Sequence, residues 1–362
     1  MRLIRSVSFI AAVAAASAAV LVGVPLPAAG ATAAAPALPQ HLRDTGLYVA
    51  GSSTTVRADV FAYTPQYALW SDGAAKQRWL SLPPGTFIDA SRPDAWVFPP
   101  GTRLWKEFAH GGRRVETRYI ERRADGRWRY AAYVWNEDGS DAVLAPAAGL
   151  PALAVAQAPG GRYAVPSRDD CLACHQSAAT PVLGVSAVQL AAGQDAAAVE
   201  PRSPDLNTLL QRGWLRRLPP TLATLPPRPA AVSASERAAL GYLHANCGHC
   251  HNDNGAPAPV PLVLAQRVGD AAASRRRVLA TTVGAPARFR SAALPGLAQI
   301  VAPGRPESSL LVARMRSRHA ALQMPPLGTA LPDPEGLALV ERWIANDLSP
   351  THDLSTTKEL SP

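Results

Sequence analysis

The fold of this chain is decided by two short stretches, Cys171-Leu172-Ala173-Cys174-His175 and Cys247-Gly248-His249-Cys250-His251. Both have the form C-x-x-C-H, which is the attachment pattern of c-type haem. In that chemistry the two cysteines form thioethers with the haem, and the adjacent histidine binds the iron. The sequence therefore predicts two covalently attached haems, one held by Cys171, Cys174 and His175 and one by Cys247, Cys250 and His251.

All four cysteines of the chain belong to these motifs. Paired cysteines also occur in structural zinc sites and in redox-active dithiols. A zinc site built from two C-x-x-C pairs usually places ~15–20 residues between them, and the pairs of this chain lie much farther apart. Neither alternative accounts for a histidine directly after both pairs. The haem interpretation is therefore the stronger one, and it leaves no spare thiol for a disulfide.

The composition is that of a globular protein with long irregular connections. The chain has 362 residues, of which 48% are hydrophobic and 35 are proline, and this length suffices for two or three domains. The formal net charge of +9 is compatible with an acidic partner, but arginine-rich solvated faces explain it more simply. No nucleic-acid-binding motif is present, and we expect no nucleic-acid partner.

The N-terminus resembles a secretory signal. Arg2 and Arg5 precede an apolar run from Phe9 to Val24, and Ala29-Gly30-Ala31 is a small-residue cleavage site. The run is shorter than the ~20 residues of a membrane span, so we expect residues 1–31 to be removed and no stable membrane span to remain. Export to the periplasm or beyond agrees with the haem motifs, because c-type haem is attached outside the cytoplasm.

The next part of the chain is predicted to be rich in β-strands. Residues 32–45 are an Ala- and Pro-rich flexible leader, and residues 46–165 combine short apolar runs with many turn residues. The clearest signal lies between Val115 and Trp135, where Asp125-Gly126 separates two runs of β-forming residues. An Asp-Gly pair in that setting predicts a hairpin.

The remainder is predicted to be mostly helical. Residues 166–228 hold the first haem motif and a Pro-rich linker, residues 232–350 resemble a cytochrome c domain, and residues 351–362 are a tail. Ser233 and Glu236 form a capping box that opens a helix leading into Cys247. A second helix begins at Pro334-Glu335, with Leu337, Leu339, Val340, Trp343 and Ile344 as its apolar stripe. Their contact would be close if Gly241 lay at the crossing.

Together these patterns predict an α+β protein. Its N-terminal domain would be antiparallel and β-rich, as a sandwich or a small barrel. A mostly α-helical, cytochrome c-like haem region would follow.

The second iron has a clear candidate for its distal ligand. Met324 stands in the proline-stiffened stretch Gln323-Met324-Pro325-Pro326-Leu327, after the second haem motif. A thioether favours reduced iron and raises the potential, so the sequence predicts His251 and Met324 as the axial pair. Met315 follows the apolar run from Leu310, where packing in a helical core is the better interpretation.

No methionine is left for the first iron. Candidates for its distal position are Lys106, which would have to be deprotonated far below its usual pKa of ~10.4, and His110, although a surface position is the better interpretation for this histidine. The position could also stay open. The other histidines outside the axial pairs are His41, His244, His249, His319 and His352. The sequence does not choose among these possibilities.

The chain resembles a family of largely uncharacterised bacterial secreted dihaem c-type cytochromes. The resemblance covers most of the chain after about residue 50, and it implies haems at His175 and His251 but no assigned reaction. Asp72, Lys106, Glu116 and Arg118 match the family pattern, and they either face the first haem or form an ion-pair network in the β-rich region. The matching stretches are Tyr67–Ala74, Leu82–Gly85, Phe98–Thr102, Lys106–Phe108, Glu116–Arg118, Asp170–His175, Leu183-Gly184, Tyr242–His251, Pro303–Pro306 with Ser309, and Met324–Leu327.

Three functions compete at this level. The leading hypothesis is a periplasmic dihaem cytochrome that carries electrons between its haems and a redox protein or dehydrogenase. The second is an enzyme of the dihaem peroxidase or oxygenase type, with an open or weakly ligated first haem. The third makes the β-rich region a binding module whose tryptophans stack on a carbohydrate or another organic substrate, although core packing explains those tryptophans more simply.

Overall fold

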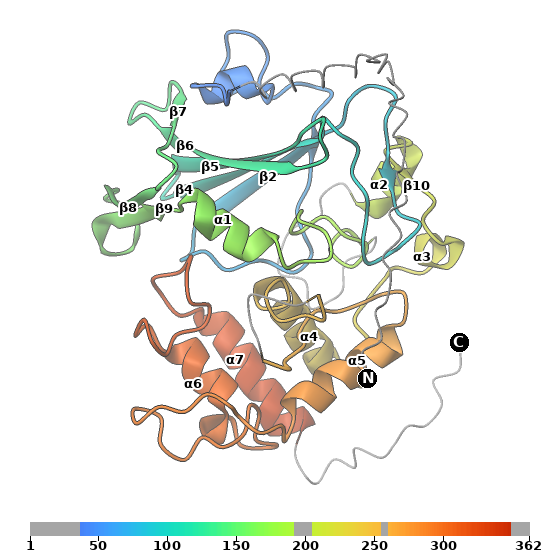
Figure 1. The fold of residues 1–362 in the computed structure, drawn as a ribbon, viewed down its shortest axis with the longest axis vertical. Coiled ribbons are helices and arrows are strands. Elements are labelled where there is room, and N and C mark those ends of the chain that lie inside the picture. The colour runs from blue at the N-terminus through green and yellow to red at the C-terminus, as the bar shows by residue number, and fades with distance from the viewer. Residues whose placement is uncertain (1–36, 192–204, 255–259, 349–362) are drawn as a thin grey trace, which may run out of the picture. The chain divides into compact units, whose positions relative to one another are not determined.

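The computed structural model describes residues 37–191, 205–254 and 260–348. The predicted signal segment, residues 32–36 of the predicted leader and the predicted tail with His352 lie outside these residues. An antiparallel sheet occupies the first half of the described chain, and most of the helices follow it (Figure 1). The predicted α+β class, with an N-terminal antiparallel β-rich region, is therefore confirmed.

The main sheet has six strands in the order β1-β2-β4-β5-β6-β7. It is open, with β1 and β7 at its edges, and does not close into a barrel. The predicted hairpin is present, because β5 and β6 pair in antiparallel register on either side of Asp125-Gly126. The strands are β1 Phe61–Ala62, β2 Ala75–Ser81, β4 Arg103–His110, β5 Arg113–Arg122, β6 Trp128–Trp135 and β7 Ala142–Leu144.

Two small sheets accompany the main one. Strand β3 (Ile88–Asp89) pairs in parallel with β10 (Leu215–Arg216), and β8 (Leu150–Ala154) pairs antiparallel with β9 (Arg162–Val165). The helical elements are η1 Leu42–Thr45, η2 Pro159–Gly161, α1 Arg168–His175, α2 Leu206–Gln211, α3 Pro220–Thr224, α4 Ala234–Asn246, α5 Ala271–Thr282, η3 Pro306–Ser308, α6 Leu310–Arg316, α7 Pro334–Arg342 and η4 Trp343–Asp347.

The two faces of the main sheet serve different purposes. One face buries an aromatic core that includes Trp79, Trp105 and Trp135. The indole N–H of Trp105 donates to Thr45 Oγ1 at 2.9 Å, and that of Trp135 donates to Thr117 Oγ1 at 3.0 Å. Core packing is thus the role of these tryptophans. Helix α1 contacts β6 and lies on the side of the sheet toward α4 (Figure 1).

Helices α4 and α7 pack against each other around the second core. Ser233 Oγ accepts a hydrogen bond from Glu236 N at the start of α4, as the capping signal predicts. The Glu236 carboxylate instead accepts from Val232 N and from Arg275, at 2.6 and 2.9 Å. In α7 and η4 the predicted apolar stripe faces the core, with Val340, Trp343 and Ile344 buried and Leu337 and Leu339 packed beside them.

The segment from Tyr67 to Asp72 joins the sheet region to the helical region. Trp70 N donates to Asn246 Oδ1 at 2.8 Å, and Asn246 Nδ2 donates to Ala68 O at 2.9 Å. The ring of Tyr67 lies directly on Gly241 of α4, where an added Cβ would come within 2.0 Å of it. The residue that packs closely on Gly241 is therefore Tyr67. Between α4 and α7 the close contact is instead that of Tyr242 with Gly336.

Among the described residues, no helix combines the length and the apolar character that crossing a membrane requires.

We expect Gly241→Ala to destabilise the protein by about 1–3 kcal/mol, because an added methyl group in a packed contact forces the Tyr67 ring to move. Helix propensity alone predicts the opposite sign, since alanine stabilises a helix interior by ~1 kcal/mol relative to glycine. Urea unfolding measures the difference. In a Tyr67→Ala background the same Gly241→Ala change should become neutral or stabilising, and stabilisation in the wild-type background would contradict the packing.

Candidate functional site

The first C-x-x-C-H motif forms the last five residues of helix α1. The helix begins with a reciprocal capping box between Ser167 and Asp170, in which Asp170 N donates to Ser167 Oγ and Ser167 N donates to the Asp170 carboxylate, at 3.1 and 2.9 Å. This cap fixes the start of the helix at Arg168, three residues before Cys171. The residues just before the motif thus supply the N-terminal cap of the helix that carries it.

His175 has the environment of a nitrogen ligand. Its Nδ1 lies 2.6 Å from the carbonyl oxygen of Pro181, so Nδ1 carries the proton and the lone pair is on Nε2. Burial lowers the pKa of His175 to about 4, which keeps the ring neutral. The Tyr130 ring of β6 lies 5.0 Å from the His175 ring, between centroids. A backbone carbonyl that orients the remote ring nitrogen is typical of metal-binding histidines.

The second motif begins where helix α4 ends, with Cys247 at the C-cap. The His251 backbone N–H donates to Cys247 O, and His251 O accepts from Leu264 N at 2.8 Å. Glycine is required at position 248, since a Cβ would come within 2.8 Å of the Ala265 backbone. Burial lowers the pKa of His251 to about 4. Its Nδ1 is buried and has no hydrogen-bond partner among the described residues.

The two motifs meet, although they are far apart in sequence. A hydrogen bond to Cys250 raises the pKa of the Cys174 thiol to about 12, and the same contact lowers the pKa of Cys250. Cys250 Sγ lies 3.8 Å from Ala173 O, and Ser177 Oγ donates to His249 O at 2.7 Å. The ends of α1 and α4 are therefore in direct contact through the motif residues themselves.

An apolar cavity of about 620 Å³ opens beside the second motif. This volume lies within the ~300–1,000 Å³ of small-molecule and cofactor sites. Cys247, Cys250 and His251 line it from one side. Met324 and Met315 both line it as well, and Met324 N donates to Arg314 O at 3.0 Å. Met315 is nine-tenths buried in the helical core, so the predicted core packing of this residue is confirmed.

The residues of this cavity fit a haem. Its wall combines thiols for covalent attachment, a neutral imidazole with an unpartnered buried nitrogen, and thioethers as soft donors. The rest of the lining includes apolar side chains, among them Leu262, Phe289 and Ile300. At the first motif Cys171, Cys174 and His175 supply the same thiol and imidazole donors, without a thioether, and His175 lines neither of the two cavities described in this subsection. The fit to the predicted cofactor thus rests on the cavity at the second motif and on the donor types alone at the first.

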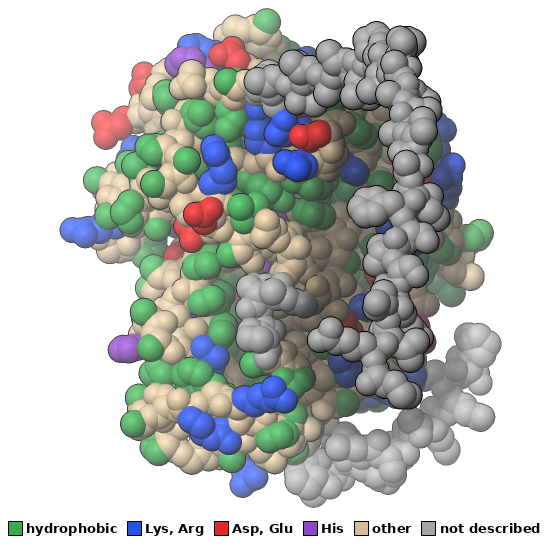
Figure 2. Space-filling view, in the orientation of Figure 1, with side chains coloured by type: hydrophobic (Ala, Val, Ile, Leu, Met, Phe, Trp, Pro, Cys, Tyr) green, Lys and Arg blue, Asp and Glu red, His purple; other side chains and the backbone are tan. Residues whose placement is uncertain are grey.

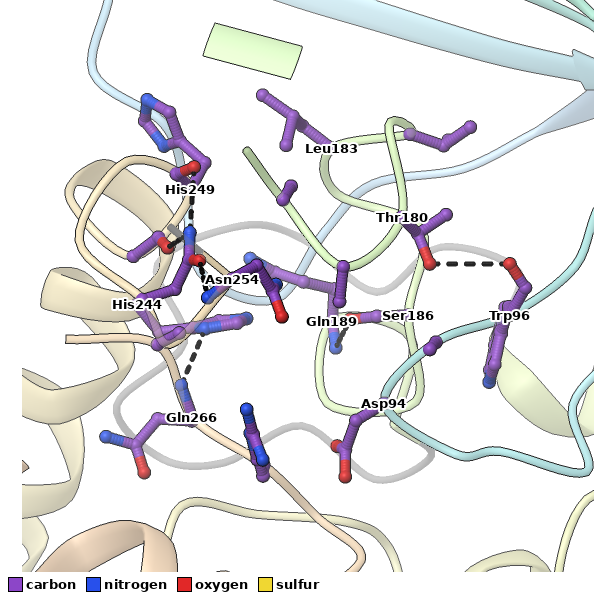
Figure 3. A pocket seen from close by; sticks show the side chains of 18 of the residues that line it. Asp94, Trp96, Thr180, Leu183, Ser186, Gln189, His244, His249, Asn254 and Gln266 are labelled. Carbon is purple, nitrogen blue, oxygen red and sulfur yellow. Dashed lines mark hydrogen bonds between the residues drawn. The ribbon is translucent and has the colours of Figure 1, made fainter. Parts of the chain in front are cut away.

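A second, more polar cavity of about 310 Å³ is lined by Gly248 and His249 of the second motif. Its walls come from the loop that follows the first motif, from the end of α4 and from the chain around Gln266 (Figure 3). His244 lines it, and its Nδ1 accepts a hydrogen bond from Gln266 N at 3.0 Å (Figure 3). His249 lines both cavities. The polar cavity does not contain either axial histidine in its lining, and the apolar one suits the cofactor better.

No cluster of three or more His, Cys, Asp or Glu side chains in residues 37–191, 205–254 and 260–348 is placed to hold a metal ion. A haem iron takes four of its ligands from the porphyrin and needs only one or two side chains from the protein.

No family model, no curated protein and no solved structure matches this chain.

The candidates for the first distal position are distributed over the structure. His41 pairs with Asp141 at 2.8 Å, and His319 is exposed. His110 was expected at the surface, but it is buried with its ring 5.7 Å from that of Tyr163, because the end of β4 is covered by the chain around β9. Lys106 is partly buried, and its Nζ lies 4.8 Å from the centre of the Phe108 ring.

The polar residues that matched the family pattern divide into two groups. Glu116 is fully buried and binds Arg118 through both oxygens, at 3.0 and 3.1 Å, and the Tyr163 hydroxyl at 2.5 Å. Asp72 is not part of this network. Its carboxylate accepts from Ala330 N and Leu331 N at 2.8 and 2.9 Å, just beyond the stretch that carries Met324. This long-range contact gave no signal in the sequence beyond the match itself.

We expect His244→Asn to flatten the pH dependence of stability between pH ~4 and ~6.5. Burial lowers the pKa of His244 in the folded protein to about 4, against ~6.5 when unfolded. The unfolded chain then binds more protons in this window, so wild-type stability falls as the pH falls, by up to about 1.4 kcal/mol per unit. Asparagine can still accept from Gln266 N but does not titrate.

Denaturant unfolding at several pH values measures this slope. The control is His319→Asn, which replaces an exposed histidine and should leave the wild-type slope unchanged. Equal slopes in wild type and His244→Asn would contradict the assignment of His244 as a buried neutral group.

Proposed function

We propose that this chain is an exported dihaem c-type cytochrome that passes electrons between its two haems and a redox partner protein. The observation that carries the proposal is the contact between the two C-x-x-C-H motifs, through Cys174 with Cys250 and through Ser177 with His249. Electron transfer rates fall steeply with distance, so two redox centres that exchange electrons must lie close together. Motifs that touch satisfy this requirement.

Each haem, when bound, supplies a one-electron iron couple, and the protein supplies attachment, orientation and electrostatics. Cys171, Cys174, Cys247 and Cys250 are the attachment points in this proposal, and His175 and His251 are the iron ligands. The Pro181 carbonyl holds the His175 ring with Nε2 available. The apolar lining around His251 limits water access, which supports a thioether ligand from Met324.

The helical region fits the proposed cytochrome c-like domain in its main features. Helix α4 leads directly into the second motif, α7 packs on α4, and the stretch with Met324 lies between α6 and α7. The sheet region would act as a scaffold that seats the first motif against β6, and as a surface for docking. In this view the Tyr67–Asp72 segment, which precedes β2, holds the second motif's helix α4 in place through Gly241 and Asn246.

The proposed partner is a periplasmic redox protein or dehydrogenase. Export is supported by the signal-like sequence of residues 1–31, which lie outside the described part of the chain. Lys and Arg side chains are dispersed among hydrophobic and uncharged ones on the face shown in Figure 2. A dispersed distribution of this kind agrees with solvated basic side chains.

Expression with a haem-attachment system should yield two thioether-bound haems per chain. Replacing both Cys171 and Cys174 by serine should leave one, and replacing both Cys247 and Cys250 should leave the other, because each motif binds its haem through its own cysteines. Intact mass and the alkaline pyridine spectrum count the haems. Two remaining haems in either double variant, or none in the wild type, would refute the proposal.

The two methionines of the apolar cavity form a matched pair. Met324→Leu should abolish the weak far-red absorption of a methionine–iron bond and lower the potential of that haem, because a soft neutral donor favours reduced iron. Met315→Leu should keep the band, since leucine preserves the core volume. A redox titration followed by visible absorption measures both. If Met315→Leu lost the band and Met324→Leu kept it, Met315 would be the iron ligand instead of Met324.

A further inference from the structure

The sheet face toward the first motif carries a row of cations. Residues directly opposite each other on neighbouring strands point to the same face, and Lys106 of β4 lies opposite Arg78 of β2 and Arg118 of β5. Tyr130 lies on the same face, two positions along the strands, since Leu104, Ile120 and Tyr130 form the adjacent row. The Tyr130 ring contacts His175. Lys106 therefore projects from the face on which the first motif is seated.

The charged groups around this row also act on the motif electrostatically. Burial raises the pKa of the Cys171 thiol to about 11, and the charge of Arg118 lowers it while that of Glu116 raises it. Lys106 and Arg118 lie near enough to His175 that a positive charge on either lowers the pKa of this histidine, after the effects of burial and of His249. The row thus lies within electrostatic reach of both the thiol and the imidazole of the motif.

The environment of Lys106 favours the neutral amine. Its pKa is held well below the usual value, first by burial and then by the charges of Arg78, Arg118 and Lys76, with Glu116 acting in the opposite direction. Among the described residues the Lys106 amine has no hydrogen bond or ion pair, and its contact is with the Phe108 ring. Glu116 is bound by Arg118 and by the Tyr163 hydroxyl instead. A neutral amine without a partner has an available lone pair.

Most of the other donors have partners elsewhere, but His249 is a rival: it is hydrogen-bonded to Cys174 beside the first motif, and its Nδ1 is buried without a partner among the described residues. Met315 and Met324 line the cavity at His251. His244 accepts from Gln266 N, and His41 pairs with Asp141. His110 remains as a rival because its Nε2 is buried without a partner in the described part of the chain, but the charges that face it are those of Asp72 and Lys76.

We infer that Lys106 is the second axial nitrogen donor of the iron bound through His175. The inference rests on the proposed dihaem function and deepens it, since a six-coordinate first haem suits electron transfer and leaves no open position for a substrate. Coordination uses the lone pair of the neutral amine and transfers no proton or electron.

The test is carbon monoxide binding to the dithionite-reduced protein, followed by visible spectroscopy. The wild type should show no shift, and Lys106→Leu should show a shift in one of its two haems while keeping the far-red methionine band of the other. Lys106→Arg should behave like Lys106→Leu, because arginine keeps the charge but stays protonated and cannot ligate. Added methylamine should suppress the shift in Lys106→Leu. The matched control is Lys76→Leu, on the same face, which should resemble the wild type.

Several results would overturn the inference. One is a wild-type protein that already binds carbon monoxide at the first haem, which needs no variant to observe. Others are a Lys106→Leu or Lys106→Arg protein with the wild-type spectrum, or a His110→Gln or His249→Gln protein in which carbon monoxide binds the first haem although Lys106 is unchanged. The count of thioether-bound haems, measured in each sample, separates this failure from failure of the proposed function: two haems with an unchanged spectrum reject Lys106 only.

Discussion

The contact between the two C-x-x-C-H motifs constrains the rest of the structure. Helix α1 packs on β6, and helix α4 packs on the Tyr67 ring. Cys174 can contact Cys250 only if these two packing contacts keep the helices in a fixed position relative to each other. The Tyr67–Asp72 segment provides that relation through hydrogen bonds to Asn246, Ala330 and Leu331. The sheet, the helical core and the chain beyond Met324 are therefore parts of one support for a pair of adjacent sites.

Features that depend on a few neighbouring residues were predictable from the sequence. The hairpin at Asp125-Gly126 follows from turn chemistry, and the start of α4 follows from the Ser233 cap. The apolar stripe of α7 gave the buried positions Val340, Trp343 and Ile344. In each case the controlling interactions span a few residues or one hairpin, so composition and spacing carry enough information.

Features that depend on distant contacts were not predictable. His110 was expected at the surface, but Tyr163, more than fifty residues later, covers it. Gly241 was considered for a helix crossing, yet its partner is Tyr67 in a loop of the sheet region. The pairing of Lys106 with Arg78 and Arg118 required the strand register, which the sequence pattern does not fix for a sheet face this polar. Met324 was proposed as a ligand from its position in the sequence. Met315 was predicted only to pack in the core, and its presence in the same cavity was not foreseen.

The two proposed haem sites differ in the distal donor and in the charges around the iron. At the first iron these two differences shift the reduction potential in opposite directions. An amine from Lys106 is a harder donor than a thioether and favours oxidised iron. The cations of Arg78 and Arg118 act in the opposite sense, because oxidation adds a positive charge beside them in a region of low dielectric. Glu116 offsets only part of this charge, since Arg118 binds its carboxylate through both oxygens. A lower potential at the first haem than at the second therefore requires the effect of the donor to exceed that of the buried cations.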